Sequence, residues 1–213
     1  MLSIVPEARP NDDLSRLSIR AMVAGAARAA RRSLSAYRLP AGHEDARRAP
    51  RDLRTALALT EQFCSGASWE NDLFARRAAL AQVAAENAAN AGAAIPKIRA
   101  NMATMSDQER VVAVWRCGDL GSITDEQCHA AHHVAFAIAR LVEAVCLVTL
   151  ARYARTARRD ADAEVYLNRI PDSIAQAFAH VPPDREELRR LRALSAGQEF
   201  PQLGDPLPPN GDE

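Results

Sequence analysis

Apolar residues recur every three to four positions along most of this chain, which is the spacing of one face of an α-helix. The first such stretch runs from Asp13 to Tyr37 and places Ile19, Met22 and Val23 on one face. No stretch alternates polar and β-branched residues in the manner of a strand. The pattern therefore predicts an all-α fold.

Two more helices are expected before residue 92. The first covers about 51–64 and follows a loop at 39–50. The second runs from Trp69 to Ala91, and the glycine at position 92 is expected to close it, because glycine commonly ends helices. The packing face of this helix is expected to contain Trp69, Leu73, Leu80 and Val83.

Prolines and capping boxes mark the later helices. Pro96 fits the first turn of a short helix, and Pro171 is expected to separate two of three short helices beyond Asp160. The pairs Ser106–Glu109 and Thr124–Gln127 have the spacing in which each side chain satisfies a backbone N–H of a new helix. Helices are therefore expected to begin directly after residues 106 and 124.

The helix after Thr124 is apolar almost all round from Val134 to Ala151, interrupted only by Arg140 and Glu143. Such a helix lies either in a protein core or in a membrane. A mid-membrane arginine costs about 2.5–3.5 kcal/mol, whereas in a core the two charges can pair, since they are three residues apart. We therefore expect other helices of the same chain to bury this segment, and we expect no membrane partner.

These elements predict a single bundle of about seven or eight helices around the long apolar helix, spanning residues 12–196. Residues 1–11 are expected to form a flexible N-terminus. Residues 197–213 contain four prolines and three glycines without helical spacing, and are expected to form a disordered tail.

Composition agrees with a bundle. Aromatic residues make up 5% of the chain, so Ala, Leu, Val and Ile must fill the core, as they do where helices pack closely. The four cysteines form no CxxC pair and no dense framework typical of secreted proteins. The N-terminus lacks the basic region of a signal peptide. We expect a cytoplasmic protein.

The sharpest chemical cluster is Cys128-His129-Ala-Ala-His132-His133. His129 and His133 are four residues apart, so their imidazoles share one helix face and could supply two ligands to a divalent metal ion. The string 129–133 is similar to the histidine pattern near the end of DinB-like metal-binding bundles. That resemblance implies a third histidine from an earlier helix, and His43 is the only one upstream. It covers five of the 213 residues, and we do not assign the chain to that family.

Arginine dominates the basic residues, since Lys97 is the only lysine. The net charge is zero, but residues 1–54 hold eleven Arg against six Asp and Glu. Arginine strips on two helices could contact a partner protein or phosphate groups. The candidate residues are Arg16, Arg20, Arg31 and Arg38 on the first helix and Arg152, Arg155 and Arg159 at the end of the long one.

Three functions remain open. The first is a non-catalytic protein that acts by protein–protein interaction or regulation, with another protein or a second copy as its partner. The second is a metal-dependent helical protein or enzyme that uses His129 and His133. The third is a nucleic-acid-associated regulator that uses the arginine strips. No Gly-x-Ser-x-Gly elbow or Gly-rich phosphate loop is present, so we assign no catalytic residue and favour the first.

Overall fold

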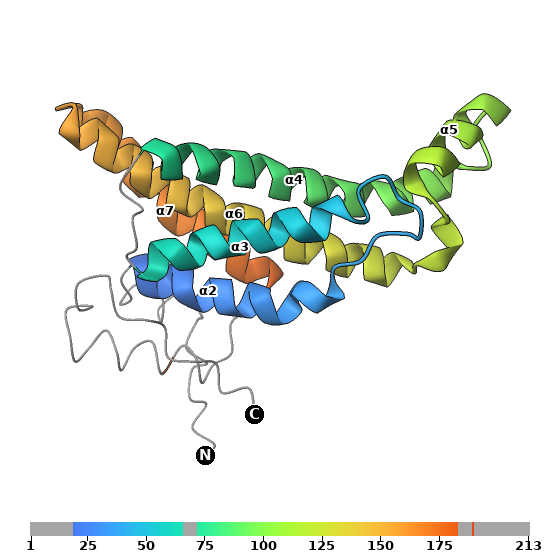
Figure 1. Ribbon diagram of the computed structural model, residues 1–213, viewed down its shortest axis with the longest axis horizontal. Helices are drawn as coiled ribbons and strands as arrows, with labels where there is room; N and C mark the ends of the chain where they lie inside the picture. Colours follow the sequence, from blue (N-terminus) through green and yellow to red (C-terminus); the bar gives the residue numbers. More distant parts are fainter. Residues whose placement is uncertain (1–18, 66–71, 183–188, 190–213) are drawn as a thin grey trace, which may run out of the picture.

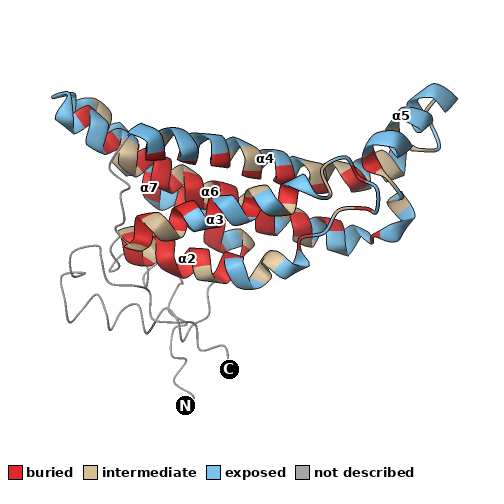
Figure 2. Cartoon of the chain, in the orientation of Figure 1, coloured by how far each residue is buried: buried red, intermediate tan, exposed pale blue. Residues whose placement is uncertain are grey.

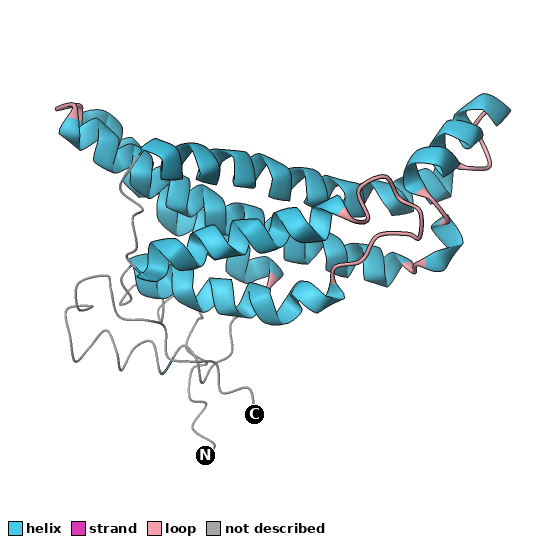
Figure 3. Ribbon diagram, in the orientation of Figure 1, coloured by secondary structure: helices cyan, strands magenta, loops and turns pink. Residues whose placement is uncertain are grey.

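A computed structural model describes residues 19–65, 72–182 and 189 of the chain. These residues contain six α-helices, two short 3-10 helices and no strand (Figures 1 and 3). The elements are α2 (Ile19–Ser33), η1 (Leu34–Ala36), α3 (Arg48–Ser65), α4 (Asp72–Asn101), α5 (Asp107–Cys117), η2 (Leu120–Ser122), α6 (Asp125–Thr156) and α7 (Asp160–His180). The all-α prediction is confirmed, although the described helices number six and not seven or eight. The predicted termini 1–11 and 197–213 lie outside the described residues.

The central element is α6, which contacts α2, α3, α4 and α7 (Figure 1). Between Val134 and Ala151 only Leu150 is exposed, and most of the other side chains are buried (Figure 2). Among the described helices, α6 alone is long and apolar enough to cross a membrane by length and composition, and 61% of its most apolar window is buried inside the protein. The packing is that of a core helix, as the apolar pattern predicts.

Helix α4 packs on α6 through small side chains. Its buried positions are mainly alanines, together with Phe74, Gly92 and Ile95. This face excludes Leu73, Leu80 and Val83, which are all exposed. The predicted packing face of this helix is therefore wrong. Alanine and glycine allow the two helix axes to approach more closely than leucines would, and the burial of close-packed backbone outweighs the larger side chains left outside.

Two predicted helix ends are also wrong, because α4 continues through Gly92 and Pro96 to Asn101, and α7 continues through Pro171. Gly92 faces α6: a Cβ there would lie 3.0 Å from the backbone nitrogen of His132. The glycine is needed for close approach and not for a helix end. Each proline removes one backbone hydrogen bond, but buried residues beside it, Ile95 and Ile170, hold both helix halves on α6.

Both predicted capping boxes are confirmed. The Ser106 side chain accepts from the N–H of Glu109, whose carboxylate accepts from the N–H of Ser106. Thr124 and Gln127 do the same at the start of α6. Local sequence alone specifies these two helix starts. The predicted caps at residues 12, 13 and 68 lie outside the described residues.

A polar seam runs along the edge of α6 between α4 and α7. The Arg140 guanidinium donates to Glu143 at 2.7 Å, as the spacing predicts, and to Glu86 of α4 at 2.6 Å. On the other side Glu143 accepts from the hydroxyl of Ser173 on α7 at 3.1 Å. Both central charges are mostly buried. The seam therefore ties three helices together through charge-assisted hydrogen bonds.

We expect Arg140→Ala to destabilise the protein by about 3 kcal/mol, because it leaves Glu143 and Glu86 without their shared cation in a mostly buried place. The matched control is Arg155→Ala, which breaks an exposed pair with Glu164 and should cost at most about 1 kcal/mol. Denaturant unfolding measures both. Equal losses in the two variants would contradict the structural role of the seam.

We expect Gly92→Ala to lower the free energy of unfolding by about 1–3 kcal/mol, although alanine is the better helix former. The new Cβ would meet backbone atoms of α6, 3.0 Å from the nitrogen of His132 and 3.2 Å from the carbonyl oxygen of Cys128. Asn90→Ala, at an exposed position of the same helix, is the control and should be neutral or slightly stabilising. A stabilised Gly92→Ala protein would show that α4 and α6 are not this close.

Candidate functional site

Helix α5 projects from the end of the bundle, in the connection between α4 and α6 (Figure 1). Only Cys117 of its eleven residues is buried. Four large apolar side chains are exposed within five consecutive positions: Val111, Val112, Val114 and Trp115. We call this helix with its cap residue Ser106 the α5 arm. The sequence predicts the helix, but not that the bundle leaves its apolar side chains uncovered.

The α5 arm is held at its base by the loop that precedes α3. The Arg116 guanidinium pairs with Glu44 at 2.9 Å, and the N–H of Asp119 donates to the carbonyl of Ala41 at 2.8 Å. Gly118 lies between them with φ of +69°, and a Cβ there would come within 2.6 Å of the backbone nitrogen of His43. Only glycine fits this contact, so the arm has a fixed base.

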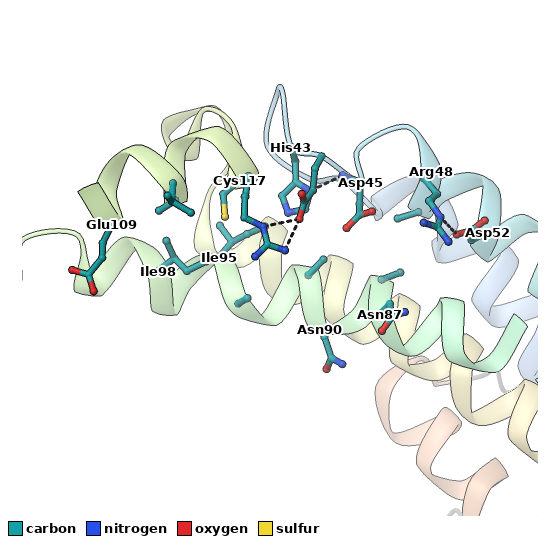
Figure 4. A pocket seen from close by; sticks show the side chains of 18 of the residues that line it. His43, Asp45, Arg48, Asp52, Asn87, Asn90, Ile95, Ile98, Glu109 and Cys117 are labelled. Carbon is teal, nitrogen blue, oxygen red and sulfur yellow. Dashed lines mark hydrogen bonds and ion pairs between the residues drawn. The ribbon is translucent and has the colours of Figure 1, made fainter. Parts of the chain in front are cut away.

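A groove of about 980 Å³ lies between the α5 arm, α4 and the start of α3 (Figure 4). We call it the α4–α5 groove. Its floor is one face of α4, formed by Ala84, Ala88, Ala91, Ala94, Ile95 and Ile98. One wall is the loop and first turns of α3, from His43 to Asp52, and the other is the α5 arm. The buried Tyr37 hydroxyl donates to the Ala88 carbonyl at 3.1 Å and fixes the loop against α4.

The groove walls carry an excess of negative charge. Four carboxylates and two guanidinium groups line it: Glu44, Asp45, Asp52 and Glu109 against Arg48 and Arg116. Arg48 pairs with Asp52 at 3.2 Å, and Arg116 pairs with Glu44. With His43 neutral, the lining has a formal charge of −2, four negative groups less two positive ones.

His43 and Cys117 are the two side chains of the groove with catalytic potential. The Nδ1 of His43 accepts the N–H of Asp45 at 3.0 Å, and burial lowers the pKa of this imidazole. Burial likewise raises the pKa of the Cys117 thiol. A neutral imidazole whose Nδ1 is already hydrogen-bonded, beside a protonated thiol, does not form an activated nucleophile. The arrangement favours binding over chemistry.

The histidines predicted to bind metal are only partly brought together. The Nδ1 of His133 lies 2.6 Å from the Nδ1 of His180 on α7, while His129 is exposed. His132 shares its Nδ1 hydrogen with the carbonyl of Ala89 at 3.0 Å. Within residues 19–65 and 72–182, no group of three or more His, Cys, Asp or Glu side chains is placed to hold a metal ion. The separation of the two Nδ1 atoms is that of a hydrogen bond.

His180 escapes the sequence analysis because it is 47 residues beyond His133. The signal that could have located it is the antiparallel hairpin of α6 and α7. Helix α6 ends at Thr156 and α7 starts at Asp160, so residues at similar distances from this turn face each other. The misplaced break at Pro171 hides that register.

The predicted arginine strips are mostly engaged by acidic side chains. Arg20 is buried with its guanidinium over the Phe63 ring, so it does not belong to an exposed strip. Arg31 pairs with Glu61. At the end of α6, Arg155 pairs with Glu164, and Arg159 with Asp162. Arg38 and Arg152 are exposed, and Arg16 lies outside the described residues. The described arginines do not form one continuous basic surface.

No protein-family model, curated protein or solved structure matches the chain. Geometry and chemistry alone therefore support a functional proposal.

The His133–His180 contact predicts a loss of stability in acid. Burial, with the neighbouring imidazoles, lowers the pKa of both side chains. A lowered histidine pKa gives stability that is complete above the unfolded-state pKa of about 6.5 and is lost as the pH falls through the folded-state value. We expect the free energy of unfolding to fall more between pH 7.5 and pH 5 in the natural protein than in His180→Asn, whose amide keeps a hydrogen bond but gains no charge. His129→Asn is the control and should behave as the natural protein; identical pH profiles for all three would contradict the role of the pair.

Proposed function

We propose that this chain is a non-catalytic protein–protein interaction module, and that its partner docks on the α5 arm and in the α4–α5 groove. The observation that carries the proposal is the exposure of Val111, Val112, Val114 and Trp115 on one short helix. Exposed apolar side chains scattered singly are ordinary, but a cluster beside a groove is typical of an interaction surface. Tryptophan is also among the residues enriched at the energetic centres of interfaces.

The anchoring of the arm supports docking. An isolated helix of eleven residues is only marginally stable in water. Here the Ser106–Glu109 capping box fixes one end, and Gly118 with the Arg116–Glu44 pair fixes the other. The arm therefore keeps its shape without burying its apolar side chains. A surface ordered before binding loses less conformational entropy when a partner arrives.

The groove chemistry supports binding in preference to catalysis. Its histidine is neutral and hydrogen-bonded, and its thiol is protonated. We further propose that the protein acts in the cytoplasm, because all four cysteines are buried free thiols, which a reducing compartment preserves.

The test compares proteins captured from cells that express the chain. We expect a specific partner to be retained by the natural protein and lost by the double variant Val111→Ser/Trp115→Ser, whose side chains are 68% and 76% exposed. Because these side chains contribute little to the core, stability should change by about 0.5 kcal/mol or less. The matched control is Val165→Ser/Tyr153→Ser, with exposures of 59% and 64% on the far part of the bundle.

Mass spectrometry identifies the captured proteins, and analytical ultracentrifugation tests whether the partner is a second copy of the chain. Retention by the control and loss by the arm variant supports the proposal in either case. If no protein, including a second copy, distinguishes the arm variant from the control, the α5 arm is not a docking surface.

A further inference from the structure

We infer that the partner segment held by the α4–α5 groove is an amphipathic α-helix whose apolar stripe is flanked by basic side chains. This inference rests on the proposed function and specifies the chemistry of the partner. It follows from the spacing of the groove floor, from the composition of its lining and from the charge of its walls.

The floor has helical spacing and small side chains. Ala84, Ala88, Ala91, Ile95 and Ile98 succeed one another at intervals of four, three, four and three residues along α4. They form a straight strip of about 21 Å at 1.5 Å per residue, the length of a partner helix of about 14 residues. Alanine at three of these positions allows a second helix to approach to the short interaxial distance of about 8 Å seen between small-residue faces. α4 already packs in this way on α6 through its other face.

Other kinds of peptide fit the groove less well. An extended peptide is usually held by the free edge of a sheet, and the described residues contain no strand. A polyproline segment is held between aromatic side chains, and the groove lining contains no Phe, Tyr or Trp. Helix-in-groove binding needs neither feature. It needs an apolar trough, which the alanine floor and Val112 on the arm supply.

The walls select the charge of the partner. Asp45 and Asp52 lie on the α3 side of the groove and Glu109 on the arm side (Figure 4). Basic side chains on both flanks of a docked helix would meet these carboxylates, whereas acidic flanks would meet like charge. Arg48 and Arg116 already pair with Asp52 and Glu44, which leaves the excess of two negative charges for the partner.

The test uses the whole protein and three synthetic 15-residue peptides with the same Leu/Ala stripe. One has lysine flanks, one has glutamate flanks, and one has lysine flanks and two central prolines that prevent helix formation. Calorimetry measures their affinity at low and at physiological salt. We expect the lysine helix to bind at least about tenfold more tightly than either other peptide, and its affinity to fall with added salt.

Two variants separate the floor from the charge. Ala91→Leu fills the trough without changing charge and should weaken the lysine helix at least about tenfold. Asp45→Asn/Glu109→Gln removes two charges, keeps a residue able to cap α5, and should weaken binding about fivefold. Asp172→Asn, at an exposed position of α7, is the control and should change nothing.

Equal binding of the lysine and glutamate helices, equal binding of the proline peptide, or no binding of any of them would overturn the inference. The proposed function fails by a different result, namely the absence of any partner that depends on Val111 and Trp115. A partner that needs the α5 arm but presents a different segment would refute the inference and leave the interaction module standing.

Discussion

The close approach of α4 and α6 determines most of what this structure presents to its surroundings. Gly92 and the alanines of α4 bring the two backbones into contact, with room for no more than a hydrogen atom at position 92. Because small side chains fill that interface, the larger Leu73, Leu80 and Val83 remain outside. The same contact places the Ala88–Ala91 face of α4 away from α6, where it becomes the floor of the α4–α5 groove.

The sequence predicts the features that depend on local chemistry. The two capping boxes locate the starts of α5 and α6, and the all-round apolar segment with its Arg140–Glu143 pair identifies the core helix. It fails where tertiary contact overrides local preference. Gly92 and Pro171 have the local chemistry of helix ends, yet both lie inside helices that the core holds on each side. Hydrophobic spacing also selects leucine over alanine as the packing face of α4, and backbone approach reverses that choice.

The candidate site depends on relations between distant segments, which explains why little of it could be predicted. The groove joins residues 43–52 to residues 84–98 and 106–117, and no motif links these stretches. His180 meets His133 only because α6 and α7 form a continuous antiparallel hairpin. The exposed apolar side chains of α5 resemble those of any amphipathic helix in sequence. Only the arrangement in space shows that Gly118 and the Arg116–Glu44 pair hold this helix away from the bundle that would otherwise cover it.

The central claim is that the α4–α5 groove with its arm is where this protein meets its partner. Hydrogen–deuterium exchange on the natural protein, with and without the captured partner, tests it most directly because it reports every backbone segment at once. The account predicts slower exchange in residues 43–52, 84–98 and 106–117 when the partner is bound. Protection confined to α2, α7 or the Arg152–Arg159 end of α6, with those three segments unchanged, would contradict it.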